Sequence, residues 1–174
     1  QHIGLCNYGA DALKHARTLA PIATLQTPLN MLKRDYLGRL QPTCTDPPAY
    51  QNTALGLGVI AYEPLARGLL SGKYRAPKPF GADDLRSLDD RFKGGRFLRA
   101  LSLVTDLDKV ARKLCVPVSS LAIAWCIRQA GVTTSIVGVK RPAQVEENIQ
   151  AAQLLDHPRL WRLLDRLVEE FKPL

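Results

Sequence analysis

Short apolar segments alternate with longer helical ones along most of this 174-residue chain, and this alternation restricts the fold more than any other feature. Four segments are apolar, partly β-branched and short enough to be buried strands. The predicted strands are residues 3–6, 22–26, 58–62 and 135–139. Short buried strands that are separated by helices build a parallel sheet from right-handed βαβ units. The pattern therefore predicts the α/β class.

Helical spacing marks the segments between and after these strands. The predicted helices are residues 10–20, 98–114, 118–129, 143–155 and 158–171, with a weakly helical segment at 31–40. Pro21 ends the first helix, Pro117 precedes the third, and Asp156 is the expected cap of the last. Two stretches rich in proline, glycine and polar residues, 41–52 and 75–95, are predicted to be loops.

Two folds accommodate four βα units, an open doubly wound sheet or part of a (β/α)8 barrel. The stretch "GLGVIA" at residues 56–61 fits the dinucleotide pattern G-x-G-x-x-A, which would favour the open sheet. That fingerprint follows a strand and opens a helix, whereas these glycines precede a strand, so we reject the match. A barrel of this type needs about 250 residues, and 174 residues therefore hold only part of an ordinary one.

Cysteine and histidine usage argues against a disulfide framework and against a metal site. The four cysteines form no Cys-x-x-Cys pair, and the three histidines are scattered without ligand spacing. We expect reduced, mostly buried thiols in a cytoplasmic protein. No apolar run is long enough to cross a bilayer, so no membrane association is predicted. The amino terminus, with no initiator Met, leads us to expect no signal peptide and a chain cut from a longer one.

The formal net charge of +8 raises the possibility of a nucleic-acid partner. The Lys and Arg residues are, however, interleaved with acids, as in "RSLDDRFKGGR", and no basic run or aromatic–basic recognition motif is present. We therefore predict an ordinary solvated surface and no nucleic-acid partner. A smaller anion, such as a nucleotide phosphate, would need only a few of these charges.

The stretch "GVIAYEPLARGLLSGKY", residues 58–74, indicates where such an anion would bind. A predicted core strand runs directly into a loop that contains proline, glycine and basic residues. Active sites of barrels form at the carboxyl ends of their strands. The stretch is therefore typical of a rigid strand that presents a loop to an anionic ligand.

Four stretches resemble, in family order, segments of the aldo-keto reductases. They are "HIGLCNYGADAL", "PIATLQTPLNML", "GVIAYEPLARGLLSGKY" and "VPVSSLAIAWCIRQAGVTTSIVGVKRPAQVEENIQA". The resemblance covers nearly the whole chain and implies a (β/α)8 TIM-type barrel of which this chain holds about strands five to eight. The family's catalytic Asp, Tyr, Lys and His lie on earlier strands. The resemblance therefore assigns no catalytic residue here, and we expect no turnover from this chain alone.

What the resemblance does imply is an NADP(H) site. Asn7 and Gln26 match positions that hold the nicotinamide carboxamide, and Tyr62 matches the aromatic residue that stacks on the nicotinamide ring. Either amide alone would be interpreted as a turn brace, but two amides that end successive strands favour a binding role. The full set of candidate cofactor-binding residues is Cys6, Asn7, Gln26, Tyr62, Glu63, Pro64, Leu65, Ala66, Gly68, Lys73, Gly138, Val139, Lys140, Arg141, Gln144, Glu147 and Asn148.

The phosphate groups would be held by two further segments. Leu65, Ala66, Gly68 and Lys73 match the loop that passes the pyrophosphate, where a glycine permits close backbone approach. In "GVKRPAQVEEN", Lys140 and Arg141 precede a helix and match the pair that holds the ribose phosphate of NADP. The adenine positions are matched by residues on one face of that helix, namely Gln144, Glu147 and Asn148.

Three departures from the family pattern affect the expected site. Cys6 stands where Ser is usual, and a thiol is the poorer hydrogen-bond partner. Glu63 also stands where Ser is common, and its carboxylate would oppose a pyrophosphate. The region between Cys44 and Gly56 is Pro-rich and longer than the short helix that is usual there.

The sequence thus supports two interpretations. The first is the NADP(H)-binding portion of a reductase that acts on aldehydes or ketones, with a small carbonyl substrate bound by the full-length parent. The alternative is a non-catalytic NADP(H)-sensing module, as the family relatives attached to potassium channels suggest. In either case half a barrel would leave open strand edges near Ile3 and Ile136, and we expect self-association through them.

Overall fold

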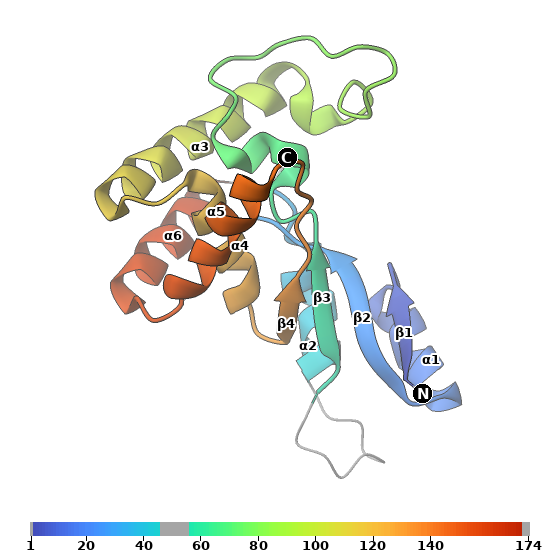
Figure 1. Ribbon diagram of the computed structural model, residues 1–174. Coiled ribbons are helices and arrows are strands. Elements are labelled where there is room, and N and C mark those ends of the chain that lie inside the picture. Colours follow the sequence, from blue (N-terminus) through green and yellow to red (C-terminus); the bar gives the residue numbers. More distant parts are fainter. Residues whose placement is uncertain (1, 46–55, 172–174) are drawn as a thin grey trace. The chain divides into compact units, whose positions relative to one another are not determined.

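The computed structural model describes residues 2–45 and 56–171 (Figure 1). These residues form two compact units. The first comprises Gln1–Pro64 and Cys126–Gly138, and the second comprises Leu65–Trp125 and Val139–Leu174. The chain therefore passes between the units three times, after Pro64, after Trp125 and after Gly138.

The first unit is built on a parallel sheet of four strands. Its strands lie side by side in sequence order, as β1 (Ile3–Cys6), β2 (Ile22–Pro28), β3 (Gly58–Tyr62) and β4 (Val132–Ser135). Leu25 of β2 pairs with Leu5 on one side and Val59 on the other, and Leu25 and Val59 are fully buried. This arrangement confirms the parallel α/β sheet that the alternating sequence predicts.

Two helices cover one face of this sheet, α1 (Ala10–Leu19) and α2 (Gln41–Thr45) (Figure 1). Arg17 donates a hydrogen bond to the backbone oxygen of Thr43 at 2.8 Å and so joins the two helices. The prediction of a loop from residue 41 is wrong for its first five residues, since these form α2. The predicted weak helix at 31–40 is confined to a short π-helical turn at Tyr36–Leu40. The rest of the predicted Pro-rich loop lies outside the described residues. So does most of the region between Cys44 and Gly56, which was noted as longer than is usual in the family.

The last strand differs from the prediction. Residues 135–139 were expected to form it because they are apolar, but β4 occupies Val132–Ser135. Ile136 donates one further backbone hydrogen bond to Ala61 at 2.9 Å, after which the chain leaves the sheet. Ile136 and Val139 are both 47% exposed, so this apolar segment does not belong to the core. The sheet ends on an edge strand with two exposed threonines, which a search for buried apolar strands does not recognise.

The second unit is mostly helical. It contains α3 (Gly94–Leu114), most of α4 (Val118–Arg128), α5 (Pro142–Gln153) and α6 (Pro158–Glu170), with short 3-10 segments at Ala66–Ser71 and Asp90–Phe92. Buried α3 side chains, such as Phe97, Val104 and Leu107, repeat at helical spacing, as predicted for 98–114. The prediction that Asp156 caps the last helix is wrong, because His157 is the N-cap residue of α6 and its side chain makes no capping hydrogen bond.

An aromatic cluster orders the long polar segment that precedes α3. Tyr74, Phe80, Phe92 and Phe97 meet edge to face, with ring centroids 5.2–6.0 Å apart. Arg86 donates to the Tyr74 hydroxyl at 2.5 Å, which links the polar part of the loop to this cluster. Edge-to-face pairs of this kind each contribute about 0.5–1.5 kcal/mol beyond their buried area. The aromatic cluster therefore anchors the predicted loop to α3 through Phe97, while most of the loop residues remain exposed.

Among the described residues, no single helix has both the length and the hydropathy of a membrane span. Only the bent pair α3 and α4, which turns by 98° at its break, passes that criterion jointly.

Candidate functional site

In the first unit, the candidates Asn7 and Tyr62 meet at the carboxyl ends of β1 and β3, and the backbone of Gln26 in β2 contacts Asn7. The Tyr62 hydroxyl donates to Oδ1 of Asn7 at 2.9 Å. The Asn7 backbone N–H donates to the backbone oxygen of Gln26, also at 2.9 Å. Because Oδ1 of Asn7 is occupied by Tyr62, the Asn7 amide nitrogen remains as a donor for a ligand. Asn7 is exposed and Tyr62 is half-buried, so the pair is accessible from solvent.

Strained backbone follows two of these strands. Asn7 has φ 61° and Glu63 has φ 55°, in the left-handed region that non-glycine residues seldom occupy. Such residues cost about 1–3 kcal/mol each and are concentrated at functional sites, where the surrounding structure enforces them. Here the strain turns the chain sharply at the point where the amide and the aromatic side chain are presented.

Asn30 holds one of these strained turns, and the sequence analysis did not identify it. Its side chain is fully buried and donates from Nδ2 to the Glu63 backbone oxygen at 3.0 Å. Its Oδ1 accepts from the backbone N–H groups of Leu32 and Lys33 at 3.0 and 2.9 Å. The available signal is a single polar residue in the otherwise apolar "PLNML", two residues after β2 ends.

In the second unit, the loop after β3 brings Gly68 and Lys73 together. Gly68 has φ +88°, and a Cβ at this position would lie 2.7 Å from the Lys73 ammonium nitrogen. The positive φ favours glycine at this position, and the absence of a side chain leaves room for the end of the lysine. Ala66 and Arg67 also have positive φ, so three consecutive residues turn the loop around the lysine. The preceding candidates Pro64 and Ala66 are buried, whereas Leu65 is half-buried.

The amino terminus of α5 carries the other cationic candidates. Arg141 is the N-cap residue and Pro142 is the first helical residue, so the helix begins one residue before the predicted start at 143, and Lys140 and Arg141 precede it as predicted. Lys140 and Arg141 are exposed, and their backbone N–H groups both donate to Oε1 of Gln144, at 2.8 and 3.1 Å. Gln144 thus stabilises the helix start and keeps only its amide nitrogen for a ligand.

The remaining candidates on and before α5 are less constrained. Glu147 is exposed, Asn148 is half-buried, and the Glu147 backbone oxygen accepts from the Ser120 hydroxyl at 2.8 Å. Gly138 has open space where a Cβ would lie, so its backbone does not require glycine. Val139, the next residue, is exposed.

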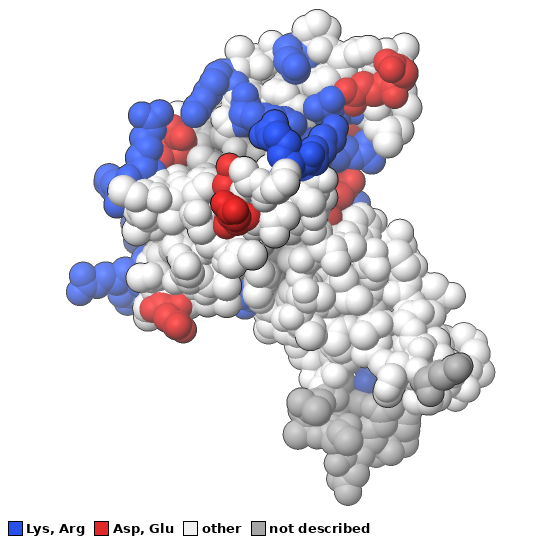
Figure 2. Space-filling model, viewed as in Figure 1, with Lys and Arg blue, Asp and Glu red and all other residues white. Residues whose placement is uncertain are grey.

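Positive charge is concentrated in the second unit. Most of the 24 Lys and Arg residues belong to its sequence ranges. On the face that Figure 2 shows, basic side chains gather over this unit, whereas the first unit is almost entirely uncharged. Hydrogen bonds from Arg86 lower the pKa of the Asp84 carboxyl to about 2, and the positive charge of Lys140 adds to the lowering. The Asp84 carboxylate therefore stays ionised at neutral pH.

The cysteines are all free, and two of them differ from the expected burial. Cys44 and Cys126 are buried, whereas Cys6 and Cys115 are exposed. Burial raises the pKa of the Cys44 thiol to about 11 and that of Cys126 still further, so both are inert thiols at neutral pH. In the described part of the chain, no group of three or more His, Cys, Asp or Glu side chains is arranged to hold a metal ion.

Comparison with known proteins identifies the family. The sequence model of the Aldo/keto reductase family matches residues 1–168. This chain belongs to that family. It is 32% identical over 157 residues to "Aldo-keto reductase str7" of Strobilurus tenacellus, a match that covers 88% of this chain and 44% of the relative.

Two relatives from Schizosaccharomyces pombe match nearly the whole chain. "Aldo-keto reductase yakc [NADP(+)]" is 27% identical over 176 residues, which cover 99% of this chain and 47% of the relative. A "Putative voltage-gated potassium channel subunit beta" is 27% identical over 183 residues, with 98% and 51% covered. The chain of this family member thus spans about half the length of the curated relatives that it matches.

The fold comparison agrees with the family. The solved glycerol dehydrogenase AKR11B4 from Gluconobacter oxydans superposes with a TM-score of 0.84 at 28% identity, covering 99% of this chain and 50% of that one. The four-stranded parallel α/β fold is therefore similar to the barrel structures of aldo-keto reductases.

Proposed function

We propose that this chain is the NADP(H)-binding portion of an aldo-keto reductase that reduces aldehydes or ketones by hydride transfer. It would supply about strands five to eight of a (β/α)8 barrel, in a cytoplasmic protein. The observation that carries the proposal is the hydrogen bond between Tyr62 and Asn7 at the carboxyl ends of two parallel strands, with Gln26 of the strand between them bonded through its backbone to Asn7. Ligands of such barrels bind at that end of the strands.

The nicotinamide would be held by groups whose positions the sheet fixes. The Asn7 amide nitrogen would donate to the carboxamide oxygen, while Tyr62, oriented by its hydrogen bond to Asn7, would offer its ring face to the nicotinamide. Gln26 would add a second amide from the neighbouring strand. The bound cofactor would supply the hydride, and these residues would orient the ring that carries it.

The phosphates would be held by charge and by close backbone approach. Gly68 and Lys73 would take the pyrophosphate, because the ammonium group lies against a backbone that carries no side chain there. Lys140 and Arg141 precede the amino terminus of α5, where the helix dipole also favours an anion. Their two cations would make charge-assisted hydrogen bonds to a ribose 2′-phosphate, and NAD has no such group. The relative named for NADP(+) supports the same assignment.

A titration and a turnover assay on the same sample test this proposal. We expect NADPH to bind this chain more tightly than NADH in a fluorescence titration. We also expect no NADPH-dependent reduction of 4-nitrobenzaldehyde, because the resemblance assigns no catalytic acid to these residues. If neither nucleotide binds, the proposed cofactor role is wrong. If the chain reduces the aldehyde, and a substitution in the chain abolishes that turnover, then the catalytic residues do not lie outside these residues as proposed.

A second candidate function is NADP(H) sensing without chemistry. It is favoured by the similarity to the potassium channel subunit, which extends over 98% of the chain. The two functions differ in what the full-length parent carries outside these residues. A parent segment with the family's Asp, Tyr, Lys and His would favour the reductase, and its absence would favour the sensor.

The sheet also supports a proposal about assembly. Within the described residues, β1 and β4 each pair on one side only, and Ile3 and Ile136 near these edges are 46% and 47% exposed. Unpaired strand edges recruit other strands. Sedimentation velocity should therefore show dimers or larger species of this chain, and a stable monomer would count against association through the edges.

A further inference from the structure

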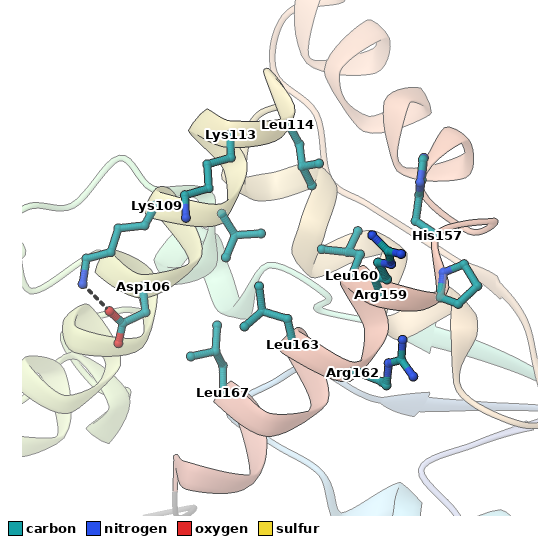
Figure 3. Close-up of a pocket in the computed structure, with 12 residues that line it drawn as sticks. Asp106, Lys109, Lys113, Leu114, His157, Arg159, Leu160, Arg162, Leu163 and Leu167 are labelled. Carbon is teal, nitrogen blue, oxygen red and sulfur yellow. Dashed lines mark hydrogen bonds and ion pairs between the residues drawn. The ribbon is translucent and has the colours of Figure 1, made fainter.

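A groove separates the outer faces of α3 and α6 within the second unit, and the proposed cofactor site uses none of its residues (Figure 3). Its volume is about 740 Å³. We call it the α3–α6 groove. It is lined by Asp106, Lys109, Val110, Lys113, Leu114, His157, Pro158, Arg159, Leu160, Arg162, Leu163 and Leu167.

The floor of the α3–α6 groove is apolar. Figure 3 shows Leu163 and Leu167 projecting from α6 towards α3, which contributes Val110 and Leu114. Leu163 is 41% exposed and Leu114 is 38% exposed. The apolar stripe of α6 is therefore wider than the face that packs into the unit. Contiguous exposed apolar surface with a polar border is typical of a binding site.

The rim of the groove is cationic on both sides. Lys109 and Lys113 lie one turn apart on α3, and Arg159 and Arg162 lie one turn apart on α6. The lining contains one carboxylate, Asp106, which already pairs with Lys109 at 2.6 Å. In the part of the chain that the structure describes, Lys113, Arg159 and Arg162 have no carboxylate partner. The groove therefore offers unneutralised positive charge beside an apolar floor.

The size of the groove favours a small molecule over a protein helix. The lining of α3 runs from Asp106 to Leu114, which corresponds to about 12 Å of helix. A partner helix of that length would be marginal by itself and would bury little area. The volume instead lies in the range of about 300–1,000 Å³ that is usual for small-molecule sites.

We propose that the α3–α6 groove binds a single-chain amphiphile with an anionic head, such as a long-chain carboxylate. The tail lies against Leu163, Leu167 and Val110, where its burial removes apolar surface from water. The head group accepts hydrogen bonds from the unpaired cations of the rim. Neither contribution depends on the nucleotide, so this site is separate from the one proposed for NADP(H).

Isothermal titration of this chain with dodecanoate, below the concentration at which it forms micelles, tests the proposal. Dodecyltrimethylammonium is the matched cation, with the same tail and the opposite charge, and butyrate is the matched anion without the tail. We expect dodecanoate to bind about tenfold or more tightly than either. No dodecanoate binding, or equal binding of the anionic and cationic amphiphiles, would overturn the proposal.

Substitutions at four exposed residues test whether dodecanoate binds in the α3–α6 groove. Arg162→Glu should weaken dodecanoate by about tenfold, whereas Arg166→Glu, on α6 but outside the lining, should leave it unchanged. Leu163→Gln should weaken it similarly, and Leu98→Gln, an exposed leucine of α3 outside the lining, should not. Equal losses for the groove variants and their controls would place the amphiphile elsewhere and refute the assignment.

Discussion

The two units of this chain prepare for a ligand in different ways. In the first unit, Asn7 and Tyr62 are fixed by the ends of two strands of one sheet and by a hydrogen bond between their side chains. In the second unit, Lys73, Lys140 and Arg141 are exposed cations on a loop and at a helix start. Under the proposed function, the ring of the nucleotide would be recognised by fixed geometry, whereas its phosphates would be recognised by charge.

The largest expected effect comes from removing the support of the first unit. Asn30→Ala should lower the free energy of unfolding by about 1–3 kcal/mol, because it removes the side-chain partner of the Leu32 N–H and of the Glu63 carbonyl, while the Lys33 N–H keeps the Asn30 backbone oxygen. It should also weaken NADPH and NADH equally, since the Glu63 turn follows Tyr62 directly. Urea denaturation and nucleotide titration measure both effects.

The matched control for this prediction is Thr133→Ala, at an exposed position of the same sheet. It should change the free energy of unfolding by less than about 0.5 kcal/mol. If Asn30→Ala changes the free energy of unfolding as little as Thr133→Ala does, then the buried amide does not maintain the strained turn. The claim that the first unit presents its side chains by fixed geometry would then be wrong.

A smaller effect is expected at the Tyr62–Asn7 pair. Tyr62→Phe keeps the ring and removes only the hydroxyl that orients it, a loss of about 0.5–1.5 kcal/mol, or roughly two- to tenfold in affinity. NADPH and NADH should be affected alike, because both carry the same nicotinamide. A loss of affinity confined to NADPH would mean that Tyr62 contributes to binding of the 2′-phosphate. The first unit would then not be specific for the nicotinamide ring.

The smallest expected effect is electrostatic and lies in the second unit. The pKa of Asp84 is lowered from 3.8 to about 2 by its hydrogen bonds with Arg86. A lowered pKa in the folded state stabilises the fold above the unfolded-state pKa, and this contribution is lost as pH falls from about 4 towards 2. Urea denaturation should therefore show wild type more stable than Asp84→Asn near neutral pH and the difference shrinking below about pH 4.

Asp83→Asn provides the control for that pH dependence, since it removes a neighbouring exposed carboxylate without touching Arg86. A difference between wild type and Asp84→Asn that stays constant down to low pH would show that the Asp84–Arg86 pair does not titrate with folding.

Much of the fold could be predicted from the sequence, because the apolar residues that are buried in the long helix are spaced as a helix requires. Strand β3 and the long helix α3 were recognised from apolar runs and periodicity. Residues 3–6 do form strand β1, but the prediction that it is buried is wrong, because it lies at the sheet edge and is mostly exposed. Strand β4 was misplaced because its exposed threonines pair at an edge while the apolar residues after it leave the sheet. Helix α2 was missed because its proline and polar residues resemble a loop, although packing against α1 orders it.

The candidate site was predicted through family resemblance more than through local pattern. The resemblance named Asn7 and Tyr62, but the direct hydrogen bond between them depends on strand register that a sequence does not display. Asn30 was overlooked because its role is to satisfy backbone groups of other segments, which only the folded chain brings close. The apolar groove between α3 and α6 likewise needs the packing of two helices that are distant in sequence.

The most direct test of the central claim is a fluorescence titration of NADPH and NADH against wild type, Arg141→Ala and Arg166→Ala. Arg141 precedes α5, whereas Arg166 is an exposed arginine of α6 and controls for the loss of one charge. A charge-assisted hydrogen bond contributes about 1.5–3 kcal/mol, so Arg141→Ala should weaken NADPH by about tenfold or more and leave NADH nearly unchanged. Arg166→Ala should affect neither nucleotide. Equal loss of NADPH and NADH in Arg141→Ala, or no loss of either, would contradict the account, because Arg141 would then not recognise the phosphate of NADP(H).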